Sequence, residues 1–247
     1  MAGVLKLDNL SVRYGTTAAL DQVSVEIPPG SSVAVIGPNG SGKSTLLKAV
    51  AGILALSSGT VDHGDDEVAI VLQSTDVDQS VPLTVRDTVA MARFAHLGLL
   101  SRFDESDRVA IDAAIGRLQL NDLVDRQIHQ LSGGQRQRAF VAQGLAQQAD
   151  ILLLDEPLTG LDVVSRSLIA EALEGEQAAG RTVIVSTHSF AEAERSDLVL
   201  LLATRTIAFG PSEAVLTEHH LRTAFGGRFI KVGNTLVLDD PHHEHAH

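Results

Sequence analysis

Apolar and polar residues alternate near the start of the chain. The alternation runs over residues 10–14 and again over 23–27, with a turn at Gly15 between the two stretches. A period of two is typical of strands that bury one face and expose the other. The pattern therefore predicts an N-terminal antiparallel β subdomain.

Farther along the chain, short apolar runs alternate with stretches of helical periodicity. The runs lie at 32–36, 68–72, 151–154 and 182–186, and helical spacing covers 44–50, 135–147 and 163–179. Strand, helix and strand in this order predict parallel strands joined by right-handed crossovers. We therefore expect an α/β fold with a mainly parallel core sheet.

The middle of the chain carries helical signals and no β signals. Thr84 is a candidate N-cap with Asp87 three residues later, which predicts a helix over 84–96. A second helix is expected over 105–118, where apolar residues recur on one face. We interpret residues 74–148 as an α-helical subdomain inserted in the core.

The C-terminal part of the chain combines strand, helix and turn signals. A strand at 206–209, a helical patch at 212–225 and a hairpin of 229–232 with 235–238 follow one another. Gly233-Asn234 suits the two-residue turn of that hairpin. The last residues are polar and rich in histidine. The predicted organisation is one domain over 1–240 and a tail over 241–247.

Composition excludes several classes of protein. Of 247 residues, 44% are hydrophobic, and a net charge of −12 with 19 Lys and Arg argues against a nucleic-acid surface. The absence of cysteine fits a reducing compartment. We find no signal peptide, and the longest apolar stretches fall short of the roughly 18 residues that span a bilayer. A function at a membrane would therefore need a membrane partner.

A glycine-rich loop separates the expected strand at 32–36 from the helix at 44–50. It reads Gly37-Pro38-Asn39-Gly40-Ser41-Gly42-Lys43-Ser44-Thr45. Its glycines let backbone N–H groups turn inward around phosphates, Lys43 adds a cation, and Ser44 supplies a hydroxyl for Mg²⁺. A glycine turn without a ligand is the alternative, but the flanking strand and helix favour a phosphate-binding loop.

A second glycine-rich segment precedes the helical stretch at 135–147. It reads Leu131-Ser132-Gly133-Gly134-Gln135. Free N–H groups and the macrodipole at a helix N-terminus favour phosphate. We interpret the segment as a second anion cradle, so that one chain carries two candidate phosphate sites.

Two carboxylates follow the apolar run at 151–154. Asp155 and Glu156 reach the carboxyl edge of the predicted sheet, where α/β proteins bind ligands. We expect Asp155 to help hold Mg²⁺ and Glu156 to activate an attacking water. Gln73 ends another apolar run and is a candidate for contact with the metal or the water. Taken alone, two acids after an apolar strand would more often form a solvated turn, and an isolated glutamine would carry no functional weight.

Two further side chains have both a functional and a structural interpretation. His188 follows the apolar run at 182–186 and is placed to meet a terminal phosphate, although a lone histidine is more often structural. Tyr14, the only tyrosine, is a candidate for stacking on an adenine ring. Packing within the N-terminal sheet is the alternative for Tyr14.

These residues resemble, in type and order, the motifs of the ATP-binding subunits of ABC transporters. Residues 37–45 are similar to the P-loop of that family, and Leu131 to Gln135 are similar to its signature sequence. Asp155 and Glu156 resemble its Walker B motif and catalytic glutamate. The other matches are Tyr14 with the adenine-stacking aromatic, Gln73 with the Q-loop, Asp162 with the D-loop and His188 with the switch histidine. The resemblance covers residues 4–225 and implies a P-loop NTPase core.

The resemblance implies cofactors and partners. Two copies of the chain would form a homodimer around two ATP molecules with Mg²⁺, and Ser132, Gly133 and Gly134 of one copy would bind the γ-phosphate held by the other. Gln135 and Asp162 would belong to the same site. Membrane permease subunits, inserting a helix near Gln73, and a substrate-binding protein are the implied partners. The implied location is the cytoplasmic face of the cell membrane.

The branch of the family that the chain resembles indicates which solute is transported. Residues 79–89 and 135–147 resemble the zinc and manganese uptake branch. The tail from His242 to His247 carries imidazoles suited to Zn²⁺, and a disordered polar tail or a purification remnant is the alternative.

Three hypotheses remain open at this point. The main one is the energising subunit of a metal-ion importer. A soluble ATPase without transport, for example in iron–sulfur cluster assembly, is the second. The third is a metal-binding or regulatory protein in which the nucleotide only switches the conformation. An intact Glu156 and His188 argue against this third hypothesis.

Overall fold

A computed structural model of the chain describes residues 3–73, 82–96, 103–226, 229–232 and 235–238. These residues divide into two compact units. The first takes in the described parts of Met1–Leu5, Ile27–Ser32 and His63–Val185, and the second those of Lys6–Glu26, Val33–Asp62 and Ser186–His247. Each unit is described by itself.

The strands of the first unit are short and mostly buried. They are β5 (Val68–Val71), β6 (Ile151–Asp155) and β7 (Thr182–Ser186), neighbours in that order. β5 and β6 run parallel, with Val71 opposite Leu154. Every residue of β6 is buried, as its continuous apolar sequence predicts for a strand covered on both faces. The predicted strands and their parallel pairing are confirmed here.

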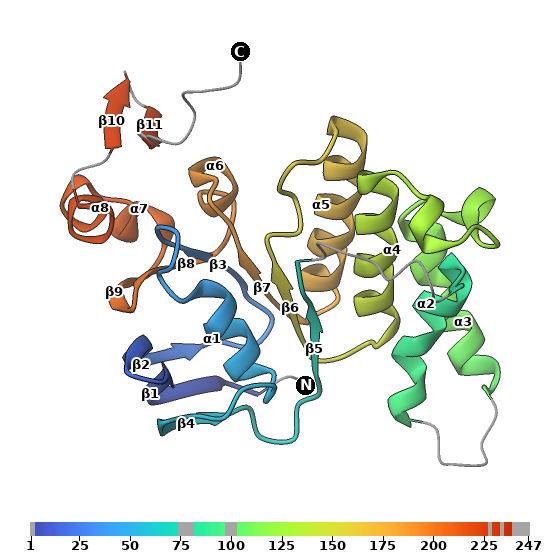
Figure 1. Ribbon diagram of the computed structural model, residues 1–247, viewed down its shortest axis with the longest axis horizontal. Helices are drawn as coiled ribbons and strands as arrows, with labels where there is room; N and C mark the ends of the chain where they lie inside the picture. Colours follow the sequence, from blue (N-terminus) through green and yellow to red (C-terminus); the bar gives the residue numbers. More distant parts are fainter. Residues whose placement is uncertain (1–2, 74–81, 97–102, 227–228, 233–234, 239–247) are drawn as a thin grey trace. The chain divides into compact units, whose positions relative to one another are not determined.

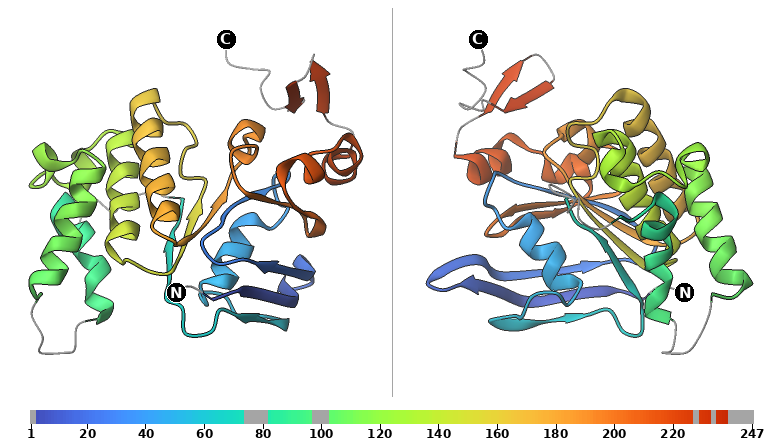
Figure 2. Two further views of the ribbon diagram at one scale, coloured as in Figure 1. Left: turned by 180° about the vertical axis from the view of Figure 1, so that it is seen from behind. Right: turned by 45° about the vertical axis from the view of Figure 1, so that its right-hand side comes forward.

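Helices make up most of the rest of the first unit. They are α2 (Val85–Ala90), η1 (Met91–His96), α3 (Glu105–Arg117), η2 (Asn121–Leu123), η3 (Ile128–Gln130), α4 (Gly133–Ala146) and α5 (Val163–Ala178). Figures 1 and 2 show α4 beside α5, with α2 and α3 next to α4. Fully buried residues such as Val89, Leu118 and Ile169 belong to one apolar core that these helices share with β5 and β6.

Capping boxes begin α2 and α3 of this unit, and the one at Thr84 was predicted from the sequence. Thr84 caps α2 in a capping box with Asp87, and Asp104 caps α3 in the same way with Asp107. The helix predicted over 84–96 is only partly α-helical, because its second half is the 3₁₀ turn η1. Arg93 on η1 is held there by Asp107 and by the carbonyl oxygens of residues 146 and 147.

The N-terminal sheet of the second unit has the predicted antiparallel form. Its strands are β1 (Leu5–Tyr14), β2 (Thr17–Ile27) and β4 (Ser58–Asp62), in the order β2-β1-β4. β4 pairs antiparallel with β1, placing Val61 opposite Leu7. Strand β4 was not predicted, because most of its residues are exposed and no alternation of apolar and polar residues marks it.

The other strands and helices of the second unit surround the phosphate-loop sequence. They are β3 (Ser32–Ile36), α1 (Lys43–Val50), α6 (Phe190–Ala193), β8 (Leu198–Ala203), β9 (Arg205–Gly210), α7 (Ser212–Val215) and α8 (Glu218–Phe225). β3 and β8 run parallel, and β9 pairs antiparallel with β8. Ile36, Leu201 and Leu221 are among the buried residues of its core.

The C-terminal region differs from the prediction in one place. The helical patch expected over 212–225 is broken into α7 and α8, because Thr217 caps a new helix by accepting a hydrogen bond from His220 N at 3.3 Å. The predicted hairpin is confirmed as β10 (Phe229–Val232) paired antiparallel with β11 (Thr235–Leu238). Its turn at 233–234 and the tail at 241–247 lie outside the described residues.

The architecture confirms the predicted α/β class, with an antiparallel N-terminal sheet and mostly parallel strands elsewhere. A single domain over 1–240 with a helical insertion over 74–148 stays a prediction. Within the part of the chain that the structure describes, no helix is both long and apolar enough to cross a membrane.

Candidate active site

The predicted site residues fall into two groups, one in each unit. The second unit holds Tyr14, the loop from Gly37 to Thr45, and His188. The first unit holds Gln73, Ser132, Gly133, Gly134, Gln135, Asp155, Glu156 and Asp162. Each group has its own geometry.

The phosphate loop lies between β3 and α1, as the sequence predicts. Gly42 is the N-cap of α1 and has a positive φ of 99°. Among the described residues, no side chain makes a cap hydrogen bond to the start of this helix. A helix N-terminus of this kind favours an anion.

Two glycines of the loop are required by close backbone approach. A Cβ added at Gly37 would lie 2.0 Å from the carbonyl oxygen of Leu202 on β8. One added at Gly42 would lie 2.5 Å from the carbonyl oxygen of Ala19 on β2. Backbone atoms move little, so both positions exclude larger residues. The loop therefore keeps its shape through contacts with β2 and β8.

Lys43 and Ser41 place polar groups inside this loop. Lys43 is 6% exposed, and its Nζ donates to the carbonyl oxygens of Gly37 at 2.9 Å and Pro38 at 3.3 Å. Ser41 is buried, and its Oγ has no hydrogen-bond partner among the described residues. A buried cation and a hydroxyl with hydrogen-bonding capacity to spare suit a phosphate group.

His188 and Tyr14 complete the group in the second unit. His188 follows β7 and is half-buried, one position before Ser189, the N-cap of α6. Tyr14 ends β1 and is 54% exposed. More than half of the residue's surface is exposed and therefore accessible to a flat ligand, and stacking on adenine stays a prediction.

Asp155 and Glu156 follow each other at the end of β6. Asp155 is 4% exposed, whereas Glu156 is half-buried and has a positive φ of 50°. A left-handed conformation costs a non-glycine residue about 1–3 kcal/mol and is concentrated at functional sites. The turn after Asp155 thus keeps Glu156 in an unusual conformation at the strand end.

The structure brings Gln73 to Glu156. Gln73 follows β5, which is paired in parallel with β6, and its Nε2 donates to Glu156 Oε2 at 3.4 Å. The two side chains therefore meet at one edge of the sheet, as expected for residues that follow neighbouring parallel strands. Two of the predicted catalytic residues lie in contact.

The second glycine-rich segment is the N-terminus of α4, as predicted. Ser132 Oγ accepts a hydrogen bond from Gln135 N at 3.3 Å, and Gln135 Oε1 accepts one from Ser132 N at 3.1 Å. These bonds form a capping box. Gly133 has open space where a Cβ would lie. This helix start therefore leaves room for a ligand or partner at Gly133.

Gly134 and Asp162 lie against each other within the first unit. A Cβ added at Gly134 would be 2.5 Å from both Asp162 Oδ2 and Ser165 Oγ. Asp162 caps α5 by accepting hydrogen bonds from Ser165 N and Ser165 Oγ, each at 2.8 Å. These two bonds lower the pKa of the Asp162 carboxyl below its usual value. The α4 and α5 N-termini are thus in contact.

The sequence pattern that defines the ABC transporter family matches residues 20–159. The chain belongs to that family. As an ABC transporter ATP-binding chain, it binds and hydrolyses ATP.

Relatives of this ABC transporter chain match over nearly its whole length. It is 39% identical to the manganese transport system ATP-binding protein MntB of Bacillus subtilis, over 97% of this chain and 99% of that protein. It is 38% identical to the zinc transport system ATP-binding protein TroB of Treponema pallidum, over 100% and 96% of the two chains. These matches support a transport function over the soluble alternative.

Solved structures of ABC transporters share the fold. An inward-facing transporter assigned to the metal-chelate type superposes with a TM-score of 0.81 at 27% identity, covering 95% of each chain. The protein cbiO1 of Clostridium perfringens, part of the ABC transporter complex cbiONQ, superposes with a TM-score of 0.70 at 30% identity, covering 89% of this chain and 92% of that one.

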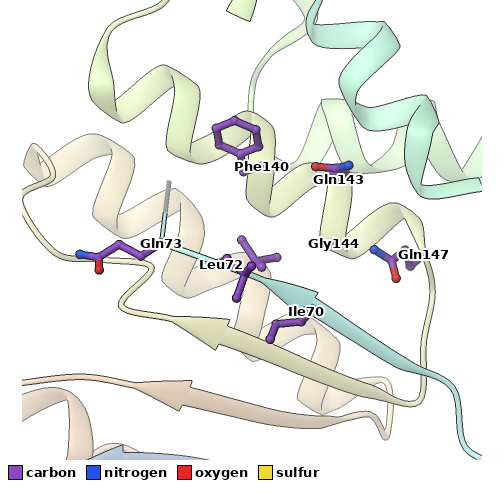
Figure 3. A pocket seen from close by; sticks show the side chains of 8 residues that line it. Ile70, Leu72, Gln73, Phe140, Gln143, Gly144 and Gln147 are labelled. Atoms are coloured by element: carbon purple, nitrogen blue, oxygen red, sulfur yellow. The ribbon is translucent and has the colours of Figure 1, made fainter. Parts of the chain in front are cut away.

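A cavity of about 350 Å³ lies next to Gln73 in the first unit. Figure 3 shows Phe140, Gln143 and Gln147 along α4 and Ile70 and Leu72 on the β5 side. The described residues that line it are apolar side chains, Gly144 and three glutamines, and none of them is charged. The sequence resemblance placed the permease contact near Gln73, and Phe140 was not among the residues predicted for it.

Proposed function

We propose that this chain is the ATP-hydrolysing subunit of an importer for divalent metal ions, manganese or zinc. The observation that supports it most is the 39% identity to the manganese subunit MntB over 97% of this chain. The zinc subunit TroB matches over 100% of it. A core fold alone would not favour a metal, because one fold serves many transported solutes.

The phosphate groups of ATP would be held by the loop from Gly37 to Thr45. Three features support this assignment: the N-terminus of α1, which no described side chain caps, the buried Lys43 ammonium, and the Ser41 hydroxyl, which has no partner among the described residues. Tyr14 would stack on the adenine, since its ring is exposed. In this assignment Lys43 neutralises charge on the terminal phosphates.

The expected Mg²⁺ ligands fit that ion by their chemistry. Ser44, Gln73 and Asp155 offer a hydroxyl, an amide and a carboxylate oxygen, and Mg²⁺ prefers oxygen ligands. When bound, the ion would neutralise charge on the β- and γ-phosphates. Asp155, buried at the strand end, would contribute the negative charge of the set.

Glu156 would orient and polarise the attacking water, and Gln73 would hold Glu156 in place. The 3.4 Å contact between their side chains supports this pairing. His188 would contact the γ-phosphate and stabilise charge that develops on it during hydrolysis. These are the chain's own contributions to hydrolysis.

A second copy of the chain would complete the site. The segment from Ser132 to Gln135 forms a helix N-terminus with open space at Gly133, which suits the γ-phosphate held by another copy. Asp162 lies against Gly134 and would belong to the same interface. The chain would therefore act as a homodimer around two ATP molecules.

Membrane permease subunits would dock at the cavity beside Gln73. Its uncharged lining suits a short permease helix that inserts apolar side chains against Phe140 and Leu72 and offers polar groups to Gln143 and Gln147. This docking would place the chain on the cytoplasmic face of the cell membrane. A substrate-binding protein would deliver the ion on the other side.

The test is transport by the complete complex. The chain is purified with its membrane subunits, reconstituted in vesicles, and assayed for ATP-dependent uptake of manganese, zinc and iron. We expect uptake of manganese or zinc that a Lys43→Ala variant abolishes. ATP-dependent transport of an unrelated solute, with no uptake of these ions, would refute the metal assignment.

A further inference from the structure

His188 lies in a short turn whose neighbours on both sides are fixed by hydrogen bonds. The turn follows β7 and runs from Thr187 to Ser189, where α6 begins. Thr187 is 4% exposed, so its hydroxyl is shielded from water. The bonds that this hydroxyl makes therefore matter for the position of the turn.

The Thr187 hydroxyl uses both its donor and an acceptor site. It donates to the carboxylate of Glu192 on α6. It also accepts a hydrogen bond from Ser189 N at 3.0 Å. His188 therefore lies between two residues that are bonded to each other through the Thr187 side chain. Hydrogen bonds to an ionised carboxylate are stronger than neutral ones.

A further hydrogen bond joins Ser189 to Glu192 at the start of α6. Ser189 Oγ accepts a hydrogen bond from Glu192 N at 3.3 Å, which is the usual N-cap bond. Glu192 thus contributes its backbone to one bond and its side chain to another. A helix of four residues has little stability of its own, so these bonds define where α6 begins.

The same turn is joined to the strand that leads into the phosphate loop. Thr187 N donates to the carbonyl oxygen of Val35 at 3.1 Å. Val35 lies on β3, two positions before Gly37, and all these residues belong to the second unit. The backbone on one side of His188 is thus tied to β3, and on the other to Glu192.

We propose that Glu192 and Thr187 are positioning residues that hold His188 for ATP hydrolysis. The proposal rests on the role given to His188 above. The carboxylate fixes Thr187, Thr187 fixes the N–H of Ser189, and the imidazole between them keeps one place relative to the phosphate loop. Small displacements of a group that acts in the transition state reduce turnover more than ground-state binding.

The test compares kcat and KM for ATP in full-length variants. Glu192→Ala and Thr187→Val remove the carboxylate and the hydroxyl, and we expect kcat to fall about tenfold with KM for ATP changed less than about twofold. Thr187→Ser keeps a hydroxyl and should restore turnover close to that of the unmodified chain. Glu194→Ala removes an exposed carboxylate near the end of the same helix and serves as the control.

A double variant separates positioning from other effects. If Glu192 acts through His188, adding Glu192→Ala to His188→Ala should lower kcat no further. A further tenfold fall would overturn the proposal. So would turnover of Glu192→Ala and Thr187→Val equal to that of the Glu194→Ala control while His188→Ala is impaired.

Two further variants separate failure of this proposal from failure of the role given to His188 and from loss of folding. Near-normal turnover of His188→Ala would instead remove the role of His188, on which the proposal rests, and would leave ATP binding by the loop unaffected. Glu192→Gln is the matched control for Glu192→Ala, because its amide oxygen still accepts a hydrogen bond from Thr187, and the melting temperatures of both variants show whether each is folded. Loss of turnover in Glu192→Ala but not in Glu192→Gln, at equal folded fraction, is the result expected.

Discussion

Arg117 on α3 donates a hydrogen bond to Glu176 on α5, a carboxylate that is only 2% exposed. Arg181 donates to the other oxygen of the same carboxylate. Arg117 also reaches the carbonyl oxygen of Ala172 at 2.8 Å. The buried Glu176 carboxylate therefore accepts hydrogen bonds from two arginines and links the C-terminal end of α3 to α5.

Removing this carboxylate should destabilise the fold. Glu176→Ala leaves both guanidinium groups without their partner, and breaking a buried pair costs 3–5 kcal/mol in general. Arg117 and Arg181 are 38% and 25% exposed, so water compensates part of the loss. We expect the free energy of unfolding to fall by about 2 kcal/mol, measured by urea denaturation.

The control for this change is Glu174→Gln, which alters an exposed carboxylate on the same helix. It should change the free energy of unfolding by less than about 0.5 kcal/mol. Equal effects of the two substitutions would show that the buried ion pair contributes nothing specific.

For Glu176, the sequence predicts the burial of the side chain but not its partner. The buried positions of α5 recur at helical spacing, and Glu176 occupies the next position of that face. The spacing therefore predicts a buried charge, which needs a partner. It does not identify Arg117, because that contact depends on how α3 packs against α5. Periodicity predicts faces, whereas partners distant in the sequence require the fold.

In the candidate site too, local features could be predicted from the sequence, whereas contacts between elements could not. The fully apolar run before Asp155 and the cap residues Ser132 and Thr84 could be read directly, because each depends on local sequence. The bond between Thr187 and Glu192 was missed, since it links a strand end to the next helix through side chains. Strand β4 was missed as well, because it exposes most of its residues.

Gly134 should tolerate substitution less well than Gly133. A methyl group at Gly134 would meet Asp162 and Ser165, whereas at Gly133 it would meet nothing within 4 Å. Gly134→Ala should therefore lower the melting temperature by several degrees, through a loss of about 1–2 kcal/mol, and Gly133→Ala should not. Thermal unfolding of the two variants side by side tests this, and equal melting temperatures would contradict the contact.

Stability at acid pH should depend on Asp87. Hydrogen bonds from the Thr84 hydroxyl and then the Thr84 backbone N–H lower the pKa of this carboxyl in the folded state. A lowered folded pKa means that the contribution is complete above the unfolded pKa, near 3.9, and is lost as pH falls through the folded pKa. Urea unfolding at about pH 3 and pH 6 should show a smaller difference in Asp87→Asn than in the unmodified chain. The exposed Asp122→Asn serves as control.

Replacing Glu156 by glutamine should separate ATP binding from hydrolysis. Glutamine keeps the size of the side chain but cannot polarise a water as a base, and a general base contributes about 10² to 10⁴ in rate. We expect kcat to fall within that range while ATP affinity is retained. Turnover and equilibrium nucleotide binding measure the two quantities, and near-normal turnover would exclude Glu156 from this role.

Ser132→Arg should prevent ATP-dependent dimerisation. Arginine adds bulk and removes the cap of α4, which costs about 1 kcal/mol by itself. Two variants serve as controls. Ser132→Asn keeps a capping side chain at the start of α4, and Ser106→Arg adds an arginine to the exposed first turn of α3.

Size-exclusion chromatography with ATP measures the dimer, with each substitution made in a chain that also carries Glu156→Gln. The chains with Ser132→Asn or Ser106→Arg should dimerise, and the chain with Ser132→Arg should elute as a monomer. Because binding to the loop of the same chain does not involve Ser132, the monomer should still bind ATP. A dimer of the Ser132→Arg variant would mean that this helix N-terminus does not face the nucleotide of a second copy.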